Sequence, residues 1–424
     1  MPKFFPFSVT LLALLVPALA LVSSDGGPAI LYVSALLATM AMGANAFKRW
    51  EPFDFHALSP LVTALGAPLL AMLVTSVMLG LWRSSEFEKL VRFALAIPLA
   101  WVLLRSSSKA LRQVQWSLLF GAYAGSLMLI AIMLTPGLGR AVVSEYGGRY
   151  NAVAFADLTL FFGLASYFTL PWTLSRWPRL EAALKLLAVP LSIYALWVSQ
   201  TRSSWALFVV FGGVVLVANR QWRMHVKASF ASALMAIMMA GAAFAWHSEE
   251  SRFSEVWKDL QRYEQHDRDT STGIRLQLWH ASWLMFKQNP WAGVGASNFR
   301  AELAELNALG IVTPRVASDF GEPHNDFLGA LAAYGMLGFL SIVALYFVPA
   351  LVFLRRLSSA DAVVHAGAKI GVLFTLGYAM FSMTEMMFRN MRSVPIYAVT
   401  LVVLYALTRT PAGAAADKTD SGLR

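Results

Sequence analysis

Long uncharged apolar runs constrain this chain more than any other feature of its sequence. Several runs exceed the roughly 18 residues that indicate a membrane-spanning helix. Because the lipid interior offers no partners to backbone N–H and C=O groups, a spanning segment must be a helix or a strand of a closed barrel. Barrel strands have about 10 residues of alternating polarity, whereas these runs are continuously apolar. The sequence therefore predicts an all-α fold, a polytopic bundle of membrane helices.

Composition supports this fold class and argues against a nucleic-acid-binding protein. Of the 424 residues, 58% are hydrophobic and 14% are charged, whereas soluble domains have about 45–50% and 25%. The formal net charge of +10 comes from Lys and Arg in short loops between apolar runs, where such residues orient a membrane protein. No phosphate-binding P-loop, zinc-finger spacing or RNA-binding motif occurs. Cysteine is absent, which excludes disulfide and thiolate chemistry.

The apolar runs predict twelve spans. They cover residues 4–22, 28–47, 59–82, 91–105, 114–135, 152–174, 183–200, 203–219, 226–246, 326–354, 364–388 and 393–409. A single helix over 183–219 would be about 55 Å long at 1.5 Å per residue. This exceeds the hydrocarbon core of about 30 Å, so we divide the run at Thr201-Arg202-Ser203.

The basic residues of alternate loops predict the orientation. One set has thirteen: Lys48, Arg49, Arg105, Lys109, Arg112, Arg176, Arg179, Lys185, Arg220, Arg223, Lys227, Arg355 and Arg356. The other has eight: Arg83, Lys89, Arg92, Arg140, Arg149, Arg202, Arg389 and Arg392. The richer set is expected in the cytoplasm, together with both termini. The long segment 247–325 is then external.

This orientation divides the chain into four parts. Residues 1–246 form nine spans, 247–325 an external helical segment, 326–410 three further spans, and 411–424 a disordered cytoplasmic tail. Within the external segment, apolar residues at helical spacing predict helices near 253–263, 273–288 and 299–308. The first of these is amphipathic and is expected to lie on the membrane or to cap the bundle.

Few acidic residues lie within the predicted spans, and no metal-binding motif is present. There is no HExxH, no Asp-x-Asp and no pair of histidines at ligand spacing. Glu385 precedes Arg389 by four residues, which suits an ion pair on a helix surface. Asp157 is expected to be a buried polar anchor.

Two arginines on the predicted external side are candidates for binding an anion. Arg202 lies in a short turn between two apolar helices, and Arg275 lies in the first turn of the second external helix. Arginine binds phosphate oxygens in a planar, bidentate manner and stays charged. The competing interpretations are an interfacial arginine that extends to lipid headgroups and an ordinary surface residue.

His324 is the candidate base. It lies in Glu322-Pro323-His324-Asn325-Asp326, directly before a predicted span. Asn and Asp are good helix caps, so this cluster can simply begin the helix, but a cap does not need His. A neutral imidazole accepts a proton near neutral pH. Arg149 and Tyr150 precede another span and are candidates for contact with phosphate or sugar, although aromatic belts are common at membrane interfaces.

Around these residues the chain resembles the O-antigen ligase and O-antigen polymerase superfamily, and most closely its ligase branch. The first matching stretch is Ser199-Gln200-Thr201-Arg202-Ser203-Ser204-Trp205. The second has Arg275, Trp279 and Phe286, then Asn289-Pro290-Trp291-Ala292-Gly293-Val294-Gly295 and Asn298-Phe299. The third is Pro323-His324-Asn325-Asp326-Phe327-Leu328, followed by Tyr334-Gly335 and Gly338. Residues 1–148 resemble the family only in hydropathy.

The resemblance implies an inverting glycosyltransferase that needs no metal and no cofactor. The donor would be undecaprenyl-pyrophosphate-linked O-antigen, and the acceptor the lipid A–core oligosaccharide of a Gram-negative inner membrane. Arg202 and Arg275 would bind the donor pyrophosphate, and His324 would activate the acceptor hydroxyl at the periplasmic face. Arg149, Tyr150, Asn325 and Arg389 are expected to contact substrate.

Other functions remain open at this point. An O-antigen polymerase would use the same donor with a second lipid-linked glycan as acceptor, and a protein O-oligosaccharyltransferase would use a protein. A lipid-linked glycan transporter or flippase also suits twelve spans, but transporter sites lie near the midplane on broken helices. The polar candidates here gather at one predicted face. A non-enzymatic membrane scaffold is a further alternative, and only the set of motifs argues against it.

Overall fold

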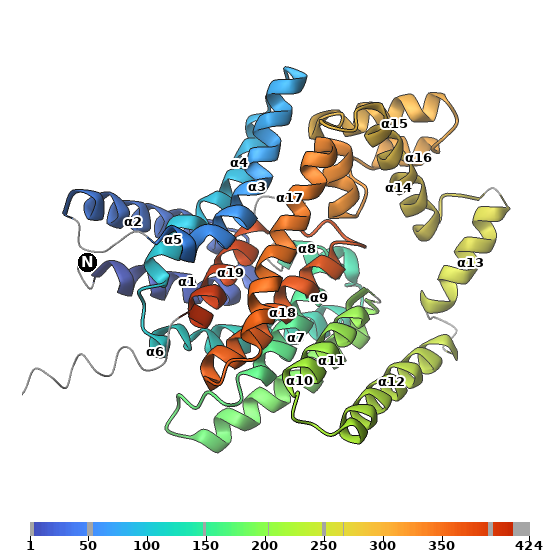
Figure 1. Cartoon of the computed structure of the whole chain (residues 1–424). Coiled ribbons are helices and arrows are strands. Elements are labelled where there is room, and N and C mark those ends of the chain that lie inside the picture. Colours follow the sequence, from blue (N-terminus) through green and yellow to red (C-terminus); the bar gives the residue numbers. More distant parts are fainter. Residues whose placement is uncertain are drawn as a thin grey trace, which may run out of the picture.

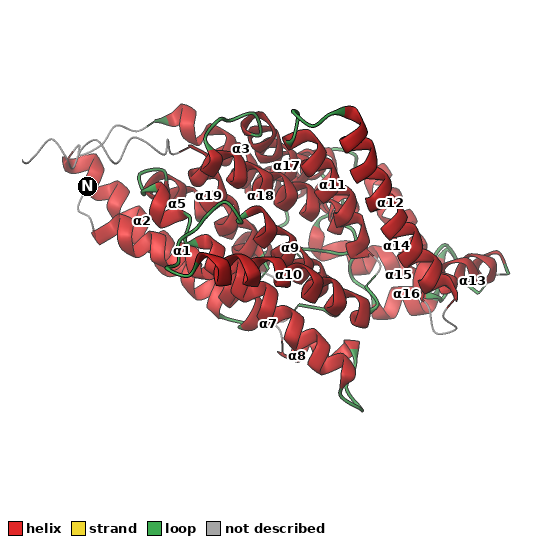
Figure 2. Ribbon diagram, turned by 90° about the horizontal axis from the view of Figure 1, so that it is seen from below, coloured by secondary structure: helices red, strands yellow, loops and turns green. Residues whose placement is uncertain are grey.

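A computed structural model describes residues 4–48, 54–146, 150–201, 203–247, 252–265, 267–388 and 393–409. Within these ranges every regular element is a helix and no strand occurs (Figure 2). The predicted all-α fold is therefore confirmed for the described part of the chain.

The helices follow one another with short connections. The N-terminal half comprises α1 (Phe4–Val22), α2 (Gly26–Lys48), α3 (Phe55–Leu79), α4 (Ser84–Ala94), α5 (Ala96–Leu103), α6 (Ser108–Leu111), α7 (Val114–Leu134), η1 (Arg140–Val142), α8 (Val143–Tyr146), α9 (Ala152–Phe168), α10 (Pro178–Ser199), η2 (Ser203–Trp205) and α11 (Ala206–Ala218). The C-terminal half comprises α12 (Met224–His247), α13 (Arg252–Glu264), α14 (Ser271–Gln288), η3 (Ala296–Asn298), α15 (Phe299–Ala308), α16 (Pro314–Asp319), α17 (Asp326–Arg356), α18 (Ala362–Phe381) and α19 (Val394–Arg409).

Each predicted span coincides with a helix or, for residues 91–105, with parts of α4 and α5. Six helical segments of the described chain are long and apolar enough to cross a membrane, namely α2, α3, α6 with α7, α10, α17 and α18. Shorter apolar helices occur at α1, α9, η2 with α11, and α19. The protein is therefore an all-α membrane protein, while the number of twelve crossings stays a prediction.

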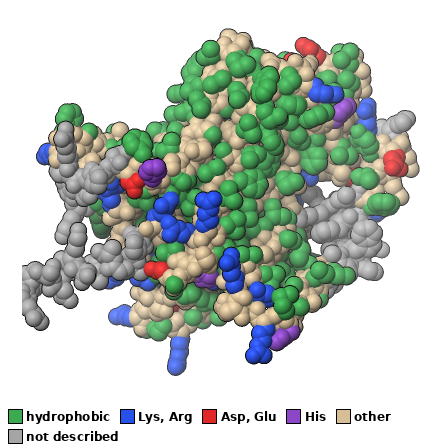
Figure 3. All heavy atoms as spheres, in the orientation of Figure 1, with side chains coloured by type: hydrophobic (Ala, Val, Ile, Leu, Met, Phe, Trp, Pro, Cys, Tyr) green, Lys and Arg blue, Asp and Glu red, His purple; other side chains and the backbone are tan. Residues whose placement is uncertain are grey.

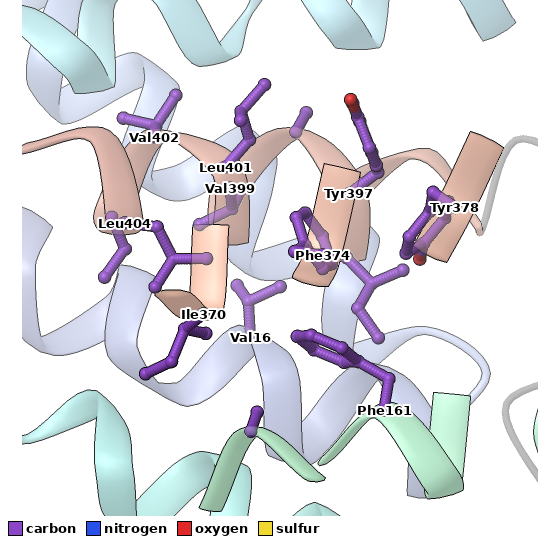
Figure 4. Packing of buried hydrophobic residues seen from close by; sticks show 14 of the residues in the cluster. Val16, Phe161, Ile370, Phe374, Tyr378, Tyr397, Val399, Leu401, Val402 and Leu404 are labelled. Atoms are coloured by element: carbon purple, nitrogen blue, oxygen red, sulfur yellow. The ribbon is translucent and has the colours of Figure 1, made fainter. Parts of the chain in front are cut away.

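The C-terminal helix α19 lies at the centre of the bundle. All of its residues from Val394 to Thr408 are buried. Figure 4 shows Tyr397 of α19 beside Phe374 and Tyr378 of α18, with Phe161 of α9 below them. The rings of Tyr397 and Phe374 stack at a centroid distance of 5.2 Å. This aromatic packing joins helices that are far apart in the sequence into one core.

The outer surface of the bundle is apolar. Large hydrophobic side chains are exposed on α1, α2, α3, α7, α10 and α17, including Phe7, Leu36, Val77, Leu127 and Leu351. In Figure 3 hydrophobic side chains form a broad band across the molecule, and most visible Lys and Arg side chains lie below it. An exposed apolar surface of this extent suits a lipid environment rather than water.

Helices α13 to α16 belong to the segment that the sequence predicts to be external. Figure 1 shows α14, α15 and α16 together beside one end of α17, with α13 beyond them. Helices α13, α14 and α15 confirm the three helices predicted there, whereas α16 was not predicted. A small hydrophobic core of this segment contains Leu278, Met285, Leu303 and Val316, and it includes Ala332 of α17. The segment therefore packs on the end of α17, and its placement outside the membrane stays a prediction.

The Pro-x-x-Gly-x-Gly motif docks on a break in α17. Gly335 has φ 61° and ψ −150°, which interrupts the helix. Val294 N–H donates to the carbonyl of Ala332 at 2.9 Å, and Met336 N–H donates to that of Pro290 at 2.8 Å. A Cβ on Gly293 would lie 2.4 Å from the carbonyl oxygen of Ala332. Only glycine permits this backbone-to-backbone contact, so the motif fixes the external segment to α17.

A buried ion pair lies beside the C-terminal end of α9. Lys185 of α10 contacts Glu181 at 2.7 Å, and the two side chains are 1% and 2% exposed. The ammonium group of Lys185 also donates to Gln115 and to the carbonyls of Thr169 and Trp172, at 2.6–2.9 Å. Glu181 accepts further bonds from Gln115 and from the backbone N–H groups of residues 174 and 175. Both charged groups are surrounded by hydrogen-bond partners from the protein, which a buried ion pair needs in order to be stable.

Candidate active site

His324 is held in a strained backbone conformation. Among the described residues, only His324 and Gln200 are non-glycine residues with positive φ, at 51° and 52°. Such a conformation costs of the order of 1–3 kcal/mol and persists only where surrounding contacts enforce it. Both residues lie in motifs that the sequence analysis identified, and His324 itself is the predicted base.

The segment that follows α18 holds the His324 loop in place. Asn325 caps α17 by accepting from Leu328 N–H at 3.0 Å, and its amide nitrogen donates to the carbonyl of Met383 at 2.9 Å. Asp326 N–H donates to the carbonyl of Ser382 at 2.8 Å. These bonds on the C-terminal side of His324 fix its backbone. They confirm that Asn325 is the helix cap, and both of its amide atoms are engaged by protein; its predicted contact with substrate stays a prediction.

His324 pairs with a buried carboxylate. Its Nδ1 lies 3.2 Å from Oε1 of Glu385, and the two side chains are 18% and 3% exposed. Burial alone would raise the pKa of Glu385, but hydrogen bonds from His324, from the Asn151 side chain and from Met386 N–H hold this pKa below its ordinary value. An ionised carboxylate only accepts hydrogen bonds, so the imidazole proton lies on Nδ1. The lone pair on Nε2 is then available to accept a proton.

The position of Glu385 differs from the prediction. Helix α18 ends at Phe381, and Glu385 lies in the turn beyond it. The helical spacing that suggested a surface ion pair with Arg389 is therefore wrong at Glu385. Arg389 lies outside the described residues. Beyond the helix end, the carbonyls of Ser382 and Met383 accept from Asp326 N–H and from the amide nitrogen of Asn325.

Arg275 is carried to the same region by α14. Trp279, one turn further along α14, donates from its indole N–H to the carbonyl of Pro323 at 3.0 Å, directly before His324. Residues four apart share a helix face and are about 6 Å apart along the axis. Arg275 is half-buried, and its guanidinium makes no hydrogen bond, ion pair or ring contact with another described residue. A half-buried cation of this kind is suited to binding an external anion.

The turn between α10 and α11 packs against the first part of α9. Arg202 lies outside the described residues, so the structure describes only its neighbours. The hydroxyl of Ser204 donates to Oδ1 of Asp157, and the side chain of Ser203 also hydrogen-bonds to Asp157. The carboxyl groups of Asp157 and Glu385 are close enough to interact electrostatically. Asp157 thus links this turn to the surroundings of His324.

The other two predicted residues lie next to α9. Arg149 lies outside the described residues. Tyr150 is 4% exposed and belongs to the hydrophobic core, so its ring is buried, whereas Tyr146 is exposed. The hydroxyl of Tyr150 has no hydrogen-bond partner among the described residues. Its predicted contact with substrate stays a prediction.

A hollow adjoins the His324 loop. It has a volume of about 190 Å³ and is lined by Glu322, Pro323 and Asp326 of the loop, by Glu86 and Lys89 of α4, and by Tyr334 of α17, among others. Ligand pockets usually have about 300–1,000 Å³, so this hollow is too small to hold a glycan by itself. Its lining shows that Glu86 and Lys89 of α4 lie near the His324 loop.

The sequence analysis missed the role of Asn151. Its side chain caps α9 by accepting from Ala154 N–H at 2.9 Å, and it also hydrogen-bonds to Glu385. The cap was detectable, since Asn stands directly before an apolar run. The contact with Glu385 was not, because the two residues are more than 200 positions apart in the sequence.

Comparison with known proteins supports the resemblance to the ligase and polymerase superfamily. Residues 187–343 match the model of a family described as O-antigen ligase. These residues are therefore similar to the O-antigen ligase family. The match contains Arg202, Arg275 and His324, and it confirms the resemblance that the three motifs indicated. Asp157 and Glu385 lie outside the matched residues.

Two curated proteins are similar to this chain. One is an O-antigen ligase of Escherichia coli strain K12, 24% identical over 309 residues, which cover 71% of this chain and 67% of the relative. The other is an uncharacterized protein of Haemophilus influenzae, 21% identical over 199 residues, which cover 46% of this chain and 49% of the relative. This chain therefore spans about half of the second protein. The family match and the Escherichia coli relative support a protein of the ligase and polymerase type.

Proposed function

We propose that this protein transfers O-antigen polysaccharide from undecaprenyl pyrophosphate to the lipid A–core oligosaccharide, at the periplasmic face of a Gram-negative inner membrane. The proposal is supported by the His324–Glu385 pair and by the bond of Trp279, one helical turn from Arg275, to Pro323 directly before His324. The Arg275 guanidinium has no partner among the described residues. A base and a cation in neighbouring positions are what a glycosyl transfer from a pyrophosphate requires.

His324 acts as the general base of this transfer. Nε2 of His324 takes the proton of the acceptor hydroxyl while its oxygen attacks the anomeric carbon of the donor. Glu385 keeps the proton of the imidazole on Nδ1 and stabilises the imidazolium that forms. The new O–C bond forms as the bond between the anomeric carbon and the pyrophosphate oxygen breaks. Attack opposite the leaving group inverts the anomeric centre.

Arg275 and Arg202 stabilise the leaving group. The electron pair of the broken bond passes to undecaprenyl pyrophosphate, whose growing negative charge needs fixed cations. Arginine supplies these charges without a metal, and its planar guanidinium binds two phosphate oxygens at once. The lipid tails of donor and acceptor stay in the membrane during the reaction, which explains why an enzyme for polar sugars is a membrane protein.

The test is a transfer assay with purified protein. Lipid-linked O-antigen and lipid A–core are supplied together with a chelator, and the joined product is quantified. Full activity is expected for the wild type, and loss of activity for His324→Ala and Arg275→Ala. A chelator-sensitive reaction restored by a divalent cation would contradict the metal-free mechanism.

Matched variants separate chemistry from folding. His280 is an exposed histidine of α14, and Arg315 is a 57% exposed arginine of α16. His280→Ala and Arg315→Ala should keep near wild-type rates. A parallel reaction with a second lipid-linked glycan in place of lipid A–core distinguishes a ligase from a polymerase, because only a polymerase would lengthen the donor-linked chain.

A further inference from the structure

Asp157 is a buried acid that the transfer mechanism does not use. It lies in the second turn of α9 and is 0% exposed. Its Oδ1 accepts from Ser204, whereas its Oδ2 has no hydrogen-bond partner among the described residues. An unpaired buried oxygen costs about 1–3 kcal/mol. Helix packing alone would favour an apolar residue here, so another demand keeps the acid in this position.

The turn after α10 is held from both sides. Arg140 donates to the carbonyl of Ser199, the last residue of α10. The next residue, Gln200, takes the left-handed conformation, and the hydroxyls of Ser199 and Thr201 lie 3.0 Å apart. Beyond the basic position of the motif, Ser203 and Ser204 both bond to Asp157. Asp157 also interacts electrostatically with Arg140. It is therefore a common partner of Arg140, on one side of the turn, and of the two serines on the other side.

Helix α9 packs closely against its neighbours and thereby holds these contacts in place. A Cβ on Gly125 of α7 would lie 2.4 Å from the hydroxyl of Thr159, and one on Gly163 would lie 2.0 Å from the hydroxyl of Ser192 on α10. Such close approach leaves α9 no freedom to shift between its neighbours. The N-terminus of α9 is fixed by Asn151, which also contacts Glu385. The same helix therefore carries contacts to the turn and to the His324–Glu385 pair.

We propose that Asp157 is a positioning residue of the transfer reaction, which holds the turn at 199–205 in register with the His324–Glu385 pair. This proposal rests on the proposed function, in which the basic residue of that turn, Arg202, binds the donor pyrophosphate. Asp157 acts through the hydroxyls of Ser203 and Ser204 and does not contact the reacting atoms. Displacing a binding group by about 1 Å can lower a rate by about 10²-fold.

The test measures donor and acceptor separately. Asp157→Asn keeps the size of the side chain but replaces one acceptor oxygen by an amide nitrogen. We expect the KM for the lipid-linked donor to rise about tenfold, with an unchanged KM for lipid A–core. The double variant Ser203→Ala/Ser204→Ala should have the same effect, and the triple variant should be no worse than either. Because the serine variant removes donors rather than the buried acid, it keeps the test available if Asp157→Asn does not fold.

A matched control is available on the same helix. Ser166 of α9 is buried, and its hydroxyl bonds at 2.8 Å only to the carbonyl of Phe162 in its own helix. Ser166→Ala should leave both KM values unchanged. Equal changes in the two KM values, or additive effects of the Asp157 and serine variants, would assign Asp157 a purely structural role and overturn the proposal.

Direct binding distinguishes failure of this inference from failure of the proposed function. Binding of undecaprenyl pyrophosphate is measured without acceptor for the wild type and for the two variants. Weakened binding in the variants, with no glycan transfer by the wild type, would overturn the proposed function and keep only the part of the inference in which Asp157 positions the turn for binding the diphosphate. Normal transfer by the wild type with unweakened binding in the variants would do the reverse.

Discussion

Two buried polar clusters lie at opposite ends of α9 and differ in how completely they are satisfied. At one end, Lys185 and Glu181 are surrounded by protein partners for every charge. At the other end, near Asn151, Oδ2 of Asp157 and the hydroxyl of Tyr150 have no hydrogen-bond partner among the described residues. His324 there is partly exposed and strained.

This difference in hydrogen-bond partners separates the polar groups that stabilise the fold from those that are available to bind a ligand. A closed network stabilises and specifies packing, and adding a ligand to it would break bonds. An open and strained cluster costs stability, and a ligand can repay this cost by supplying the missing partners.

Removing the base should affect catalysis and leave the fold unchanged. His324→Ala is expected to lower the transfer rate by about 10²–10⁴-fold, because a positioned general base contributes about this factor. The melting temperature should fall only slightly, because alanine keeps the left-handed backbone and Glu385 keeps its bonds from Asn151 and Met386 N–H when it loses His324. Initial rates and thermal unfolding of the same preparation check both parts. A rate within threefold of the wild type would remove His324 from the mechanism.

Breaking the closed cluster should have the opposite effect. Lys185→Ala leaves Glu181 buried without its partner, which typically costs about 3–5 kcal/mol. The yield and the melting temperature should fall steeply, while the remaining folded protein keeps its rate per molecule. Lys109→Ala, at an exposed lysine, is the control. If Lys185→Ala were as stable as this control, the two ends of α9 would not differ as described.

The break in α17 offers an intermediate effect. A Cβ on Gly335 would lie 2.4 Å from the carbonyl carbon of Trp291, at a φ of +61°. Gly335→Ala should therefore destabilise the protein by about 1–3 kcal/mol and loosen the docked loop. Gly213 of α11 has open space around a built Cβ, so Gly213→Ala should be neutral or slightly stabilising. Similar melting temperatures for the two variants would contradict the docking role of the motif.

The smallest effect concerns pH. The pKa of Glu385 is lowered in the folded protein, chiefly by its bond with His324 against the opposing effect of burial. Its contribution to stability is thus present above the ordinary glutamate pKa and is lost as pH falls through the folded value. The melting temperatures of wild type and Glu385→Gln should converge in acid. A gap that stays constant from neutral to acidic pH would show that the carboxylate charge contributes nothing.

The sequence predicted the helices well because each apolar run carries its own signal. The run at 152–174 became α9, and the amphipathic repeat at 253–263 became α13. The competing interpretation that the Asn325-Asp326 cluster caps a helix is confirmed for Asn325. The split of the fourth run at Leu95 and the early end of α18 at Phe381 were not predicted, because contacts with distant segments set them.

The candidate site was predicted in its residue types but not in its pairings. His324 and Arg275 stand out locally, since neither is needed where it stands for a cap or a helix. The partner of His324 was not predictable, because Glu385 reaches it only after α17 and α18 have packed. The glycines at 293 and 335 were recognised as a pattern, whereas their contact across 42 residues of sequence exists only in the folded chain.

The central claim is that the open end of α9 binds the donor, and a structure of the protein with undecaprenyl pyrophosphate tests it most directly. We expect the diphosphate within hydrogen-bond distance of the Arg275 guanidinium and on the same side of the bundle as His324 Nε2. A diphosphate bound at the other end, or beyond the reach of an acceptor that also contacts His324, would contradict the account.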